Sequence, residues 1–302
     1  MNLKVYISPN ISLSMNENFE SKPLLYFGYG SNLDSEDWTK WCNNRGENPS
    51  GLKEIGPAWL DGYQLIFDYY SSSRRCGAAN LIKDPSGKSA NPGALFEIDD
   101  YTLDLLDRKE GTKIQGCYQR ETVTVYTSDG QLHEAITYIH HAKKYAFFEP
   151  SNEYESLIRN GLNRLDLPTE QLDFALKKKI ENCFDLVFVY GTLMRGKSRY
   201  NEMENGFEFV SKGIVKGDMY HIRDYPGLIP GEGFVYGELY RASDISDGIQ
   251  RLDWIEAANN QNPLFNRVIQ EINTEQGKYW AYVYHFAQDI DKFQQIENGK
   301  WV

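Results

Sequence analysis

Apolar and polar positions run through the same series twice along this chain. The apolar residues 24–27 lead into the turn Tyr29-Gly30-Ser31-Asn32-Leu33, and the apolar residues 186–189 lead into Tyr190-Gly191-Thr192-Leu193-Met194. A short apolar run that ends at turn residues is typical of a buried β-strand. Each series therefore begins with a predicted strand that ends in a glycine-containing turn.

The segments after the first turn predict a mixture of helices and strands. Residues 34–42 are predicted to form a helix with Asp34 as its cap, and leucine spacing predicts a second helix over 99–109. Two further helices are expected at 154–162 and 169–179. Segments rich in β-branched and aromatic residues predict strands at 63–69, 91–98, 122–126 and 135–140. Asp129-Gly130 is typical of the hairpin turn between the last two strands.

The second series repeats this order. Its first strand, residues 186–190, and its turn are followed by predicted strands near 213–222 and 234–241, a helix over 244–255 and a hairpin through Gly277. Many strands with few helices around them favour the α+β class with a mixed sheet over a doubly wound α/β fold.

A distant carboxylate is repeated together with the turn. The segment Leu106-Asp107-Arg108-Lys109-Glu110 matches Leu252-Asp253-Trp254-Ile255-Glu256 at an offset of 146 residues. This spacing is far longer than the roughly 20–50 residues of solenoid repeats, so it indicates domain duplication. A chain of 302 residues also suggests about two domains. We predict an N-terminal arm at 1–22, in which 3–7 can add a short strand, and domains at 23–182 and 183–302.

Composition narrows the classes of partner and location. The net charge of −11 argues against a nucleic-acid partner, because phosphate backbones attract clustered Lys and Arg. No apolar stretch of about 18 residues predicts a membrane helix, and the first twenty residues lack the apolar core of a secretory signal. Four cysteines without a C-x-x-C pair indicate a reducing compartment, and we expect a cytoplasmic protein. The five histidines lack metal-ligand spacing, so no metal is expected.

The repeated turn and carboxylate carry the candidate chemistry. Successive backbone N–H groups in such a turn form an anion site, and Ser31, Asn32 and Thr192 add side-chain donors. Glu110 and Glu256 are the candidate acid/base groups. Taken singly, each turn reads equally as an ordinary strand-to-helix connection, and each glutamate as a solvated surface group. Asp107 with Glu110 as a glycosidase-like carboxylate pair is a further alternative.

These residues resemble the gamma-glutamylcyclotransferase superfamily, whose members carry Y-G-[ST]-[NL]-L after the first strand and a catalytic Glu in L-D-x-x-E. The resemblance covers roughly residues 23–287. The first half is similar to the gamma-glutamylcyclotransferases proper, and the second half to the gamma-glutamylamine cyclotransferase and avirulence-induced-gene branch. The fold implied is a tandem pair of mixed β-barrel domains with peripheral helices. The binding residues implied are Tyr26, Phe27, Gly28, Tyr29, Gly30, Ser31, Asn32, Leu33, Tyr118, Tyr154, Tyr190, Gly191, Thr192 and Leu193.

The resemblance implies a reaction without metal, ATP or other cofactor. The α-amine of a γ-glutamyl amide attacks its own γ-carbonyl and gives 5-oxoproline and a free amine, with Glu110, and secondly Glu256, as general acid/base. The leaving amine stays open among an amino acid, the cysteinylglycine part of glutathione, a polyamine, an ε-lysine and a protected metabolite.

Two departures from the family pattern concern the pocket walls. Phe265 stands where the first half has Tyr118, and Arg75-Cys76-Gly77-Ala78 replaces an expected tryptophan and paired glycines. The alternatives are therefore a second copy that binds or packs without turnover, and a non-enzymatic interaction protein.

Overall fold

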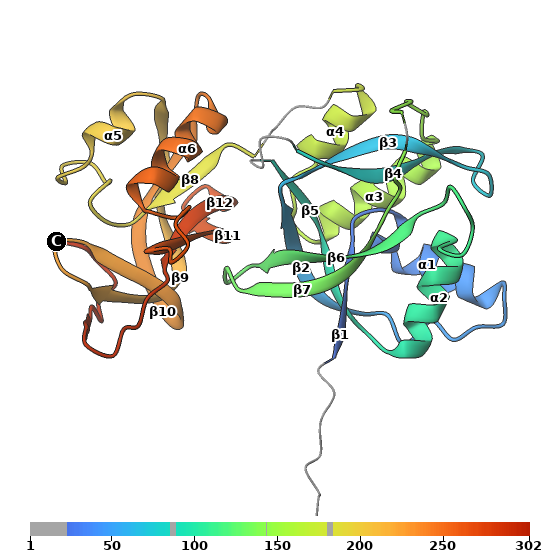
Figure 1. Ribbon diagram of the computed structural model, residues 1–302, viewed down its shortest axis with the longest axis horizontal. Coiled ribbons are helices and arrows are strands. Elements are labelled where there is room, and N and C mark those ends of the chain that lie inside the picture. Colours follow the sequence, from blue (N-terminus) through green and yellow to red (C-terminus); the bar gives the residue numbers. More distant parts are fainter. Residues whose placement is uncertain (1–22, 85–88, 143, 180–183) are drawn as a thin grey trace, which may run out of the picture.

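The computed structural model describes residues 23–84, 89–142, 144–179 and 184–302. It contains two halves, each built on a closed ring of five strands (Figure 1). This arrangement confirms the predicted α+β class and the tandem barrels with peripheral helices.

The first half carries most of the helices (Figure 1). Its elements are β1 (Leu24–Gly28), the 3-10 turn η1 (Ser31–Leu33), α1 (Ser35–Asn43), β2 (Lys53–Asp61), β3 (Tyr63–Ser71), β4 (Cys76–Lys83), β5 (Ala90–Ile98), α2 (Asp100–Glu110), β6 (Gln119–Thr127), β7 (Leu132–Ile139), α3 (Asn152–Arg164) and α4 (Glu170–Leu176). The barrel order is β1-β5-β2-β6-β7, and the parallel pair of β1 with β7 closes the ring. Strands β3 and β4 form a separate two-stranded sheet.

The second half repeats the barrel with fewer additions. Its elements are β8 (Leu186–Val189), α5 (Asn201–Glu204), β9 (Phe207–His221), β10 (Pro226–Ala242), α6 (Ile245–Ile255), β11 (Phe265–Thr274), β12 (Gly277–Phe286) and β13 (Gln294–Gln295). The ring order is β10-β8-β12-β11-β9, closed by pairing of β9 with β10, and β13 adds an edge to β9. Strands β9 and β10 follow each other directly, so this half lacks, within its described residues, a counterpart of the β3–β4 hairpin.

Local sequence signals explain the elements that carry the site. Asp34 accepts a 2.8 Å hydrogen bond from the backbone N–H of Asp37 and so caps α1 as predicted. Asp99 caps α2 in the same way, through the N–H of Thr102 at 2.7 Å. Gly111 ends α2 in the left-handed conformation at φ 73°, which suits a residue without a side chain. Glu110 is therefore the last residue of helix α2.

Strands β2 and β4 were not predicted from the sequence. Strand β2 carries a register shift between Glu54 and Gly56, which interrupts its alternation. Strand β4 contains the small residues Gly77, Ala78 and Ala79, which give little β-propensity of their own. The strands and helices that were predicted within the described residues are all present in both halves. Their ends differ from the prediction by a few residues or, in the long β9–β10 hairpin, by more.

Two corresponding glycines let strands approach closely beside each turn. A Cβ on Gly93 would lie 2.4 Å from the carbonyl oxygen of Gly28, and one on Gly237 would lie 2.3 Å from that of Val189. Each glycine directly precedes the residue that pairs with the end of the first strand of its half: Ala94 pairs with Gly28, and Glu238 pairs with Val189. The shared contact supports duplication at the level of backbone packing.

The halves contact each other through aromatic and charged side chains of β2, β11 and β12 and through Phe184, which precedes β8. Trp59 packs on Phe184 at a centroid distance of 4.6 Å and on Trp280 at 5.9 Å. The hydroxyl of Tyr282 donates to Oδ1 of Asp61 at 3.1 Å, and Arg267 lies 3.5 Å from the other carboxylate oxygen. Burial raises the pKa of Asp61, and the nearby guanidinium opposes that effect.

Two expectations fall on residues outside the described ranges. These are the arm at 1–22, with its strand at 3–7, and the domain boundary at 182/183, so both stay predictions. Among the helices described, none combines the length and apolar character needed to span a bilayer.

Candidate active sites

A cavity of about 710 Å³ opens in the first half where the loop after β1 meets the end of α2. The predicted residues that line it are Tyr26, Tyr29, Gly30, Ser31, Asn32, Glu110, Tyr118 and Tyr154. The remaining three, Phe27, Gly28 and Leu33, are buried and do not line this cavity. The turn and the carboxylate, far apart in sequence, therefore share one wall.

Asn32 connects the loop to Glu110. Its Nδ2 donates to the hydroxyl of Tyr26 at 2.8 Å and lies 3.4 Å from Oε1 of Glu110. Its Oδ1 accepts a 2.5 Å hydrogen bond from Nζ of Lys109, which also contacts the hydroxyl of Ser31 at 3.1 Å. Because an ammonium group can only donate, Lys109 orients the amide of Asn32 so that its NH₂ group faces Glu110.

Lys109 is buried beneath the loop, with a side-chain exposure of 7%. Desolvation lowers the pKa of its ammonium group, and the negative charges of Glu110 and Asp37 oppose that shift. Arg74 adds a second cation: its Nη2 lies 2.6 Å from Oδ2 of Asp37 and 3.2 Å from the hydroxyl of Ser31. The sequence pattern pointed to no role for either residue.

Three tyrosine hydroxyls bond to backbone around the same cavity. Tyr29 donates to the carbonyl of Tyr138 at 2.5 Å, and Tyr118 donates to that of Ala79 at 2.6 Å. Tyr154 accepts from the N–H of Ala79 at 3.2 Å. Burial raises the pKa of Tyr154 to about 12 and raises the pKa values of Tyr29 and Tyr118 well above their ordinary value, so all three hydroxyls stay neutral.

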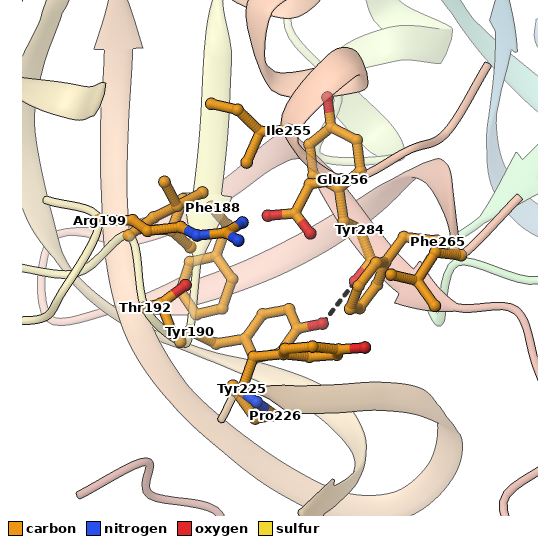
Figure 2. A pocket seen from close by; sticks show the side chains of 14 residues that line it. Phe188, Tyr190, Thr192, Arg199, Tyr225, Pro226, Ile255, Glu256, Phe265 and Tyr284 are labelled. Atoms are coloured by element: carbon orange, nitrogen blue, oxygen red, sulfur yellow. Dashed lines mark hydrogen bonds between the residues drawn. The ribbon is translucent and has the colours of Figure 1, made fainter. Parts of the chain in front are cut away.

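The second half holds a smaller cavity, of about 90 Å³, at the corresponding place. The predicted residues Tyr190, Gly191, Thr192, Leu193 and Glu256 all line it. Figure 2 shows the hydrogen bond from the Tyr190 hydroxyl to the carbonyl oxygen of Tyr284, which measures 2.7 Å. It corresponds to the Tyr29–Tyr138 bond of the first half.

Glu256 lies in a less polar setting than Glu110. The positions of Asn32 and Lys109 are taken by Leu193 and Ile255, both of which line this cavity. Burial raises the pKa of Glu256 to about 7, and Arg199, whose side chain points toward it in Figure 2, opposes the shift. A carboxyl group with this pKa exchanges protons near neutral pH, as a general acid/base requires.

An aspartate three residues before each glutamate holds a tyrosine. Oδ1 of Asp107 accepts from the hydroxyl of Tyr138 at 2.8 Å, and Oδ1 of Asp253 accepts from that of Tyr284 at 2.7 Å. Arg120 also hydrogen-bonds to Asp107. Asp107 is thus engaged by two donors, which favours an anchoring role over the glycosidase-like pair with Glu110.

The walls of the two cavities differ. In the first half, β3–β4 and α3 supply Arg74, Ala79 and Tyr154, whereas Tyr225 and Pro226 line the second cavity. Phe265 replaces Tyr118, as the sequence predicted, and the backbone carbonyl that Tyr118 bonds belongs to β4. The second half thus has neither the tyrosine hydroxyl nor, among its described residues, the β3–β4 hairpin to which that hydroxyl bonds in the first half.

The family comparison agrees with the duplicated geometry. The model of the family "Gamma-glutamyl cyclotransferase, AIG2-like" matches residues 26–157 and again residues 187–302. The chain belongs to this family. Each match contains one glycine turn and its carboxylate, so the cyclotransferase unit is present twice.

Several members of the cyclotransferase family are similar over part of the chain. The "Gamma-glutamylcyclotransferase family protein YtfP" of Escherichia coli (strain K12) is 31% identical over 116 residues, which are 38% of this chain and 95% of that protein. "Gamma-L-glutamyl-butirosin B gamma-glutamyl cyclotransferase" of Niallia circulans is 30% identical over 105 residues, covering 33% and 66%. A solved "Gamma-glutamyl cyclotransferase" is 27% identical with a TM-score of 0.44, covering 54% of this chain and 91% of its own.

Proposed function

We propose that this protein converts γ-glutamyl amides into 5-oxoproline and a free amine, with Glu110 as the principal general acid/base and Glu256 as the second. The observation that carries the proposal is the placement of Glu110 beside the glycine turn, 3.4 Å from the amide nitrogen of Asn32. Membership of the cyclotransferase family supports the general activity.

The reaction needs one proton carrier and an anion site. The α-nitrogen of the γ-glutamyl group attacks the γ-carbonyl carbon and forms the ring bond, while the glutamate takes the proton that this nitrogen loses. The carbonyl oxygen gains negative charge, and we assign its stabilisation to N–H groups of the turn at 30–32. The glutamate then gives the proton to the leaving nitrogen as its bond to carbon breaks, and it returns to its starting state.

Intramolecular attack explains how a single glutamate suffices. A substrate held in the folded shape for ring closure meets its nucleophile at a very high effective concentration, which removes several kcal/mol of the barrier.

The test separates the two sites. The wild-type protein, Glu110→Gln, Glu256→Gln and the double variant are incubated with a panel of γ-glutamyl amides, and 5-oxoproline is measured by mass spectrometry. Removing the base should lower the rate of its own site by about 10²–10⁴-fold. Glu134→Gln, on an exposed position of β7, is the matched control and should leave all rates unchanged. Glutamate as product, or full activity in the double variant, would overturn the mechanism.

The replacements at Leu193, Ile255 and Phe265 favour a second candidate, in which the second half binds a γ-glutamyl ligand without turnover. In that case Glu256→Gln leaves every rate unchanged, and Glu110→Gln abolishes them all. The same four proteins therefore decide between two active sites and one.

We also propose a cytoplasmic protein whose partner is a small molecule. Cys42, Cys76 and Cys117 are free thiols, as expected in a reducing compartment. The net charge of −11 supports the absence of a nucleic-acid partner.

A further inference from the structure

We propose that the two sites divide γ-glutamyl amides by the charge of the leaving amine. The first site selects leaving amines with two carboxylates, such as glutamate joined through its amine, and the second site does not. This inference rests on the proposed cyclotransferase function.

The first cavity is positively charged within an acidic protein. Its basic lining residues are Lys40, Arg45, Arg74, Arg108 and Lys109, and its acidic ones are Asp37, Glu110 and Glu153. Five basic against three acidic groups give this cavity a positive balance, whereas the whole chain carries −11. A cavity lined mainly by one sign of charge concentrates ligands of the opposite sign.

The cations are arranged from the interior to the rim. Lys109 and Arg74 contact Ser31 and Asp37 at the inner end. The rim is formed by one face of α1, its C-cap and the residue after the C-cap. Its residues lie at helical spacing and all line the cavity: Asp37, Lys40, Trp41, Asn44 and Arg45. A substrate with its γ-glutamyl group beside Glu110 would therefore direct its leaving amine outward along α1.

Two rim cations have no carboxylate partner within the part of the chain that the structure describes. Arg108 lies 2.7 Å from Glu47, whereas no ion pair involves Lys40 or Arg45 among the described residues. The guanidinium of Arg45 stacks 4.3 Å above the ring of Trp41 and donates to its carbonyl at 3.1 Å, which fixes its position. Lys40 and the held Arg45 are suited to two carboxylates of a leaving amine.

The second cavity offers no such surface. Its charged lining residues, among those described, are Arg199 and Glu256, one of each sign, and its volume of about 90 Å³ compares with about 710 Å³ in the first. Ile255, Leu264 and Phe265 give it apolar walls. A dianionic leaving amine would lose hydration there without gaining partners, which is a penalty against this substrate class.

The experiment compares two substrates of the same shape. γ-Glutamyl-glutamate and γ-glutamyl-glutamine differ by one negative charge on the leaving amine. We measure kcat/KM for each in the Glu256→Gln variant, in which only the first site keeps its glutamate. We expect about tenfold preference for γ-glutamyl-glutamate, falling to about twofold in Lys40→Gln/Arg45→Gln, since each exposed charge pair contributes modestly. Raising the salt concentration should reduce the preference in the same direction.

A matched control separates local charge from net charge. Lys177→Gln/Arg223→Gln removes one lysine and one arginine at exposed positions that line neither site, and it should keep the tenfold preference. In Glu110→Gln only the second site keeps its glutamate, and this variant should show no preference for γ-glutamyl-glutamate.

Each remaining outcome overturns a stated part. Equal or faster turnover of γ-glutamyl-glutamine by the first site, or a preference that survives the rim substitutions, overturns the division by charge and leaves the cyclotransferase intact. Loss of all activity in Glu256→Gln, with an active wild type, also overturns it, because turnover would then belong to the second site. No 5-oxoproline from any amide overturns the proposed function itself.

Discussion

The hydroxyl group of Tyr284 donates a 2.7 Å hydrogen bond to Oδ1 of Asp253, and the first half repeats this bond between Tyr138 and Asp107 at 2.8 Å. In both halves the backbone carbonyl of the same tyrosine accepts a bond from the tyrosine of the glycine turn. The aspartate thus fixes the distance between the helix that carries the glutamate and the strand behind the turn.

Removing Asp253 should destabilise the second half strongly. Asp253→Ala leaves the buried Tyr284 hydroxyl without its acceptor and deprives Arg267, 3.2 Å away, of one of its two carboxylates. We expect a loss of about 2–4 kcal/mol in the free energy of unfolding, measured with urea at pH 7. Asp107→Ala should cost less, because its partner Arg120 is 41% exposed; equal losses would contradict the explanation.

The burial of Glu256 predicts a pH-dependent stability difference. Its pKa rises from 4.5 to about 7 on folding, so the folded state favours the protonated form. Stability from this group is complete below pH 4.5 and is lost as the pH rises through about 7, a change on the order of 3 kcal/mol. Glu256→Gln should therefore be more stable than wild type at pH 8 and equal at pH 4. An equal difference at both pH values would contradict the prediction.

The same pKa sets the pH profile of the second site, if that site turns over. In the Glu110→Gln variant, Glu256 must be ionised to accept the first proton. The kcat/KM of this variant should therefore rise with pH and level off above about 7. Initial rates of 5-oxoproline formation between pH 5 and 9 measure this profile. A flat profile across this range would remove Glu256 from the role of base.

Lys109 is predicted to position Asn32 and the loop. In the Glu256→Gln background, Lys109→Met removes the donor to Oδ1 of Asn32, so the amide can turn away from Glu110. We expect kcat for γ-glutamyl-glutamine to fall by about 10–100-fold, with a smaller change in KM, since misplacement by about 1 Å has effects of this size. Lys113→Met, at an exposed position that does not line the cavity, should have little effect on kcat.

The close strand contacts at Gly93 and Gly237 predict equal sensitivity in the two halves. A methyl group at either position would overlap a carbonyl oxygen, at 2.4 Å and 2.3 Å, and backbone cannot move aside as a flexible side chain does. We expect Gly93→Ala and Gly237→Ala each to cost about 3 kcal/mol or more in urea unfolding. A loss below about 1 kcal/mol at either position would show that the strands separate easily.

The sequence was sufficient for the parts of the molecule that repeat. The glycine turns, Glu110, Glu256 and the cap at Asp34 were predicted because their signals are local or recur at one offset. Lys109 and Arg74 were not, because their roles depend on contacts with residues far along the chain: Lys109 resembles a solvated residue at a helix end until the fold brings Asn32 over it. The pocket wall β4 was missed because its small residues carry a weak strand signal.

The β3–β4 hairpin and helix α3 belong to the first half and have no counterpart among the described elements of the second. The duplicated barrel carries the turn and the carboxylate, whereas these unduplicated pieces carry much of the surface around them. Evolution can therefore lengthen, exchange or delete the surroundings of one site while the inherited barrel of the other stays unchanged. In engineering terms, the hairpin is a natural place to graft a different wall onto a constant reaction centre.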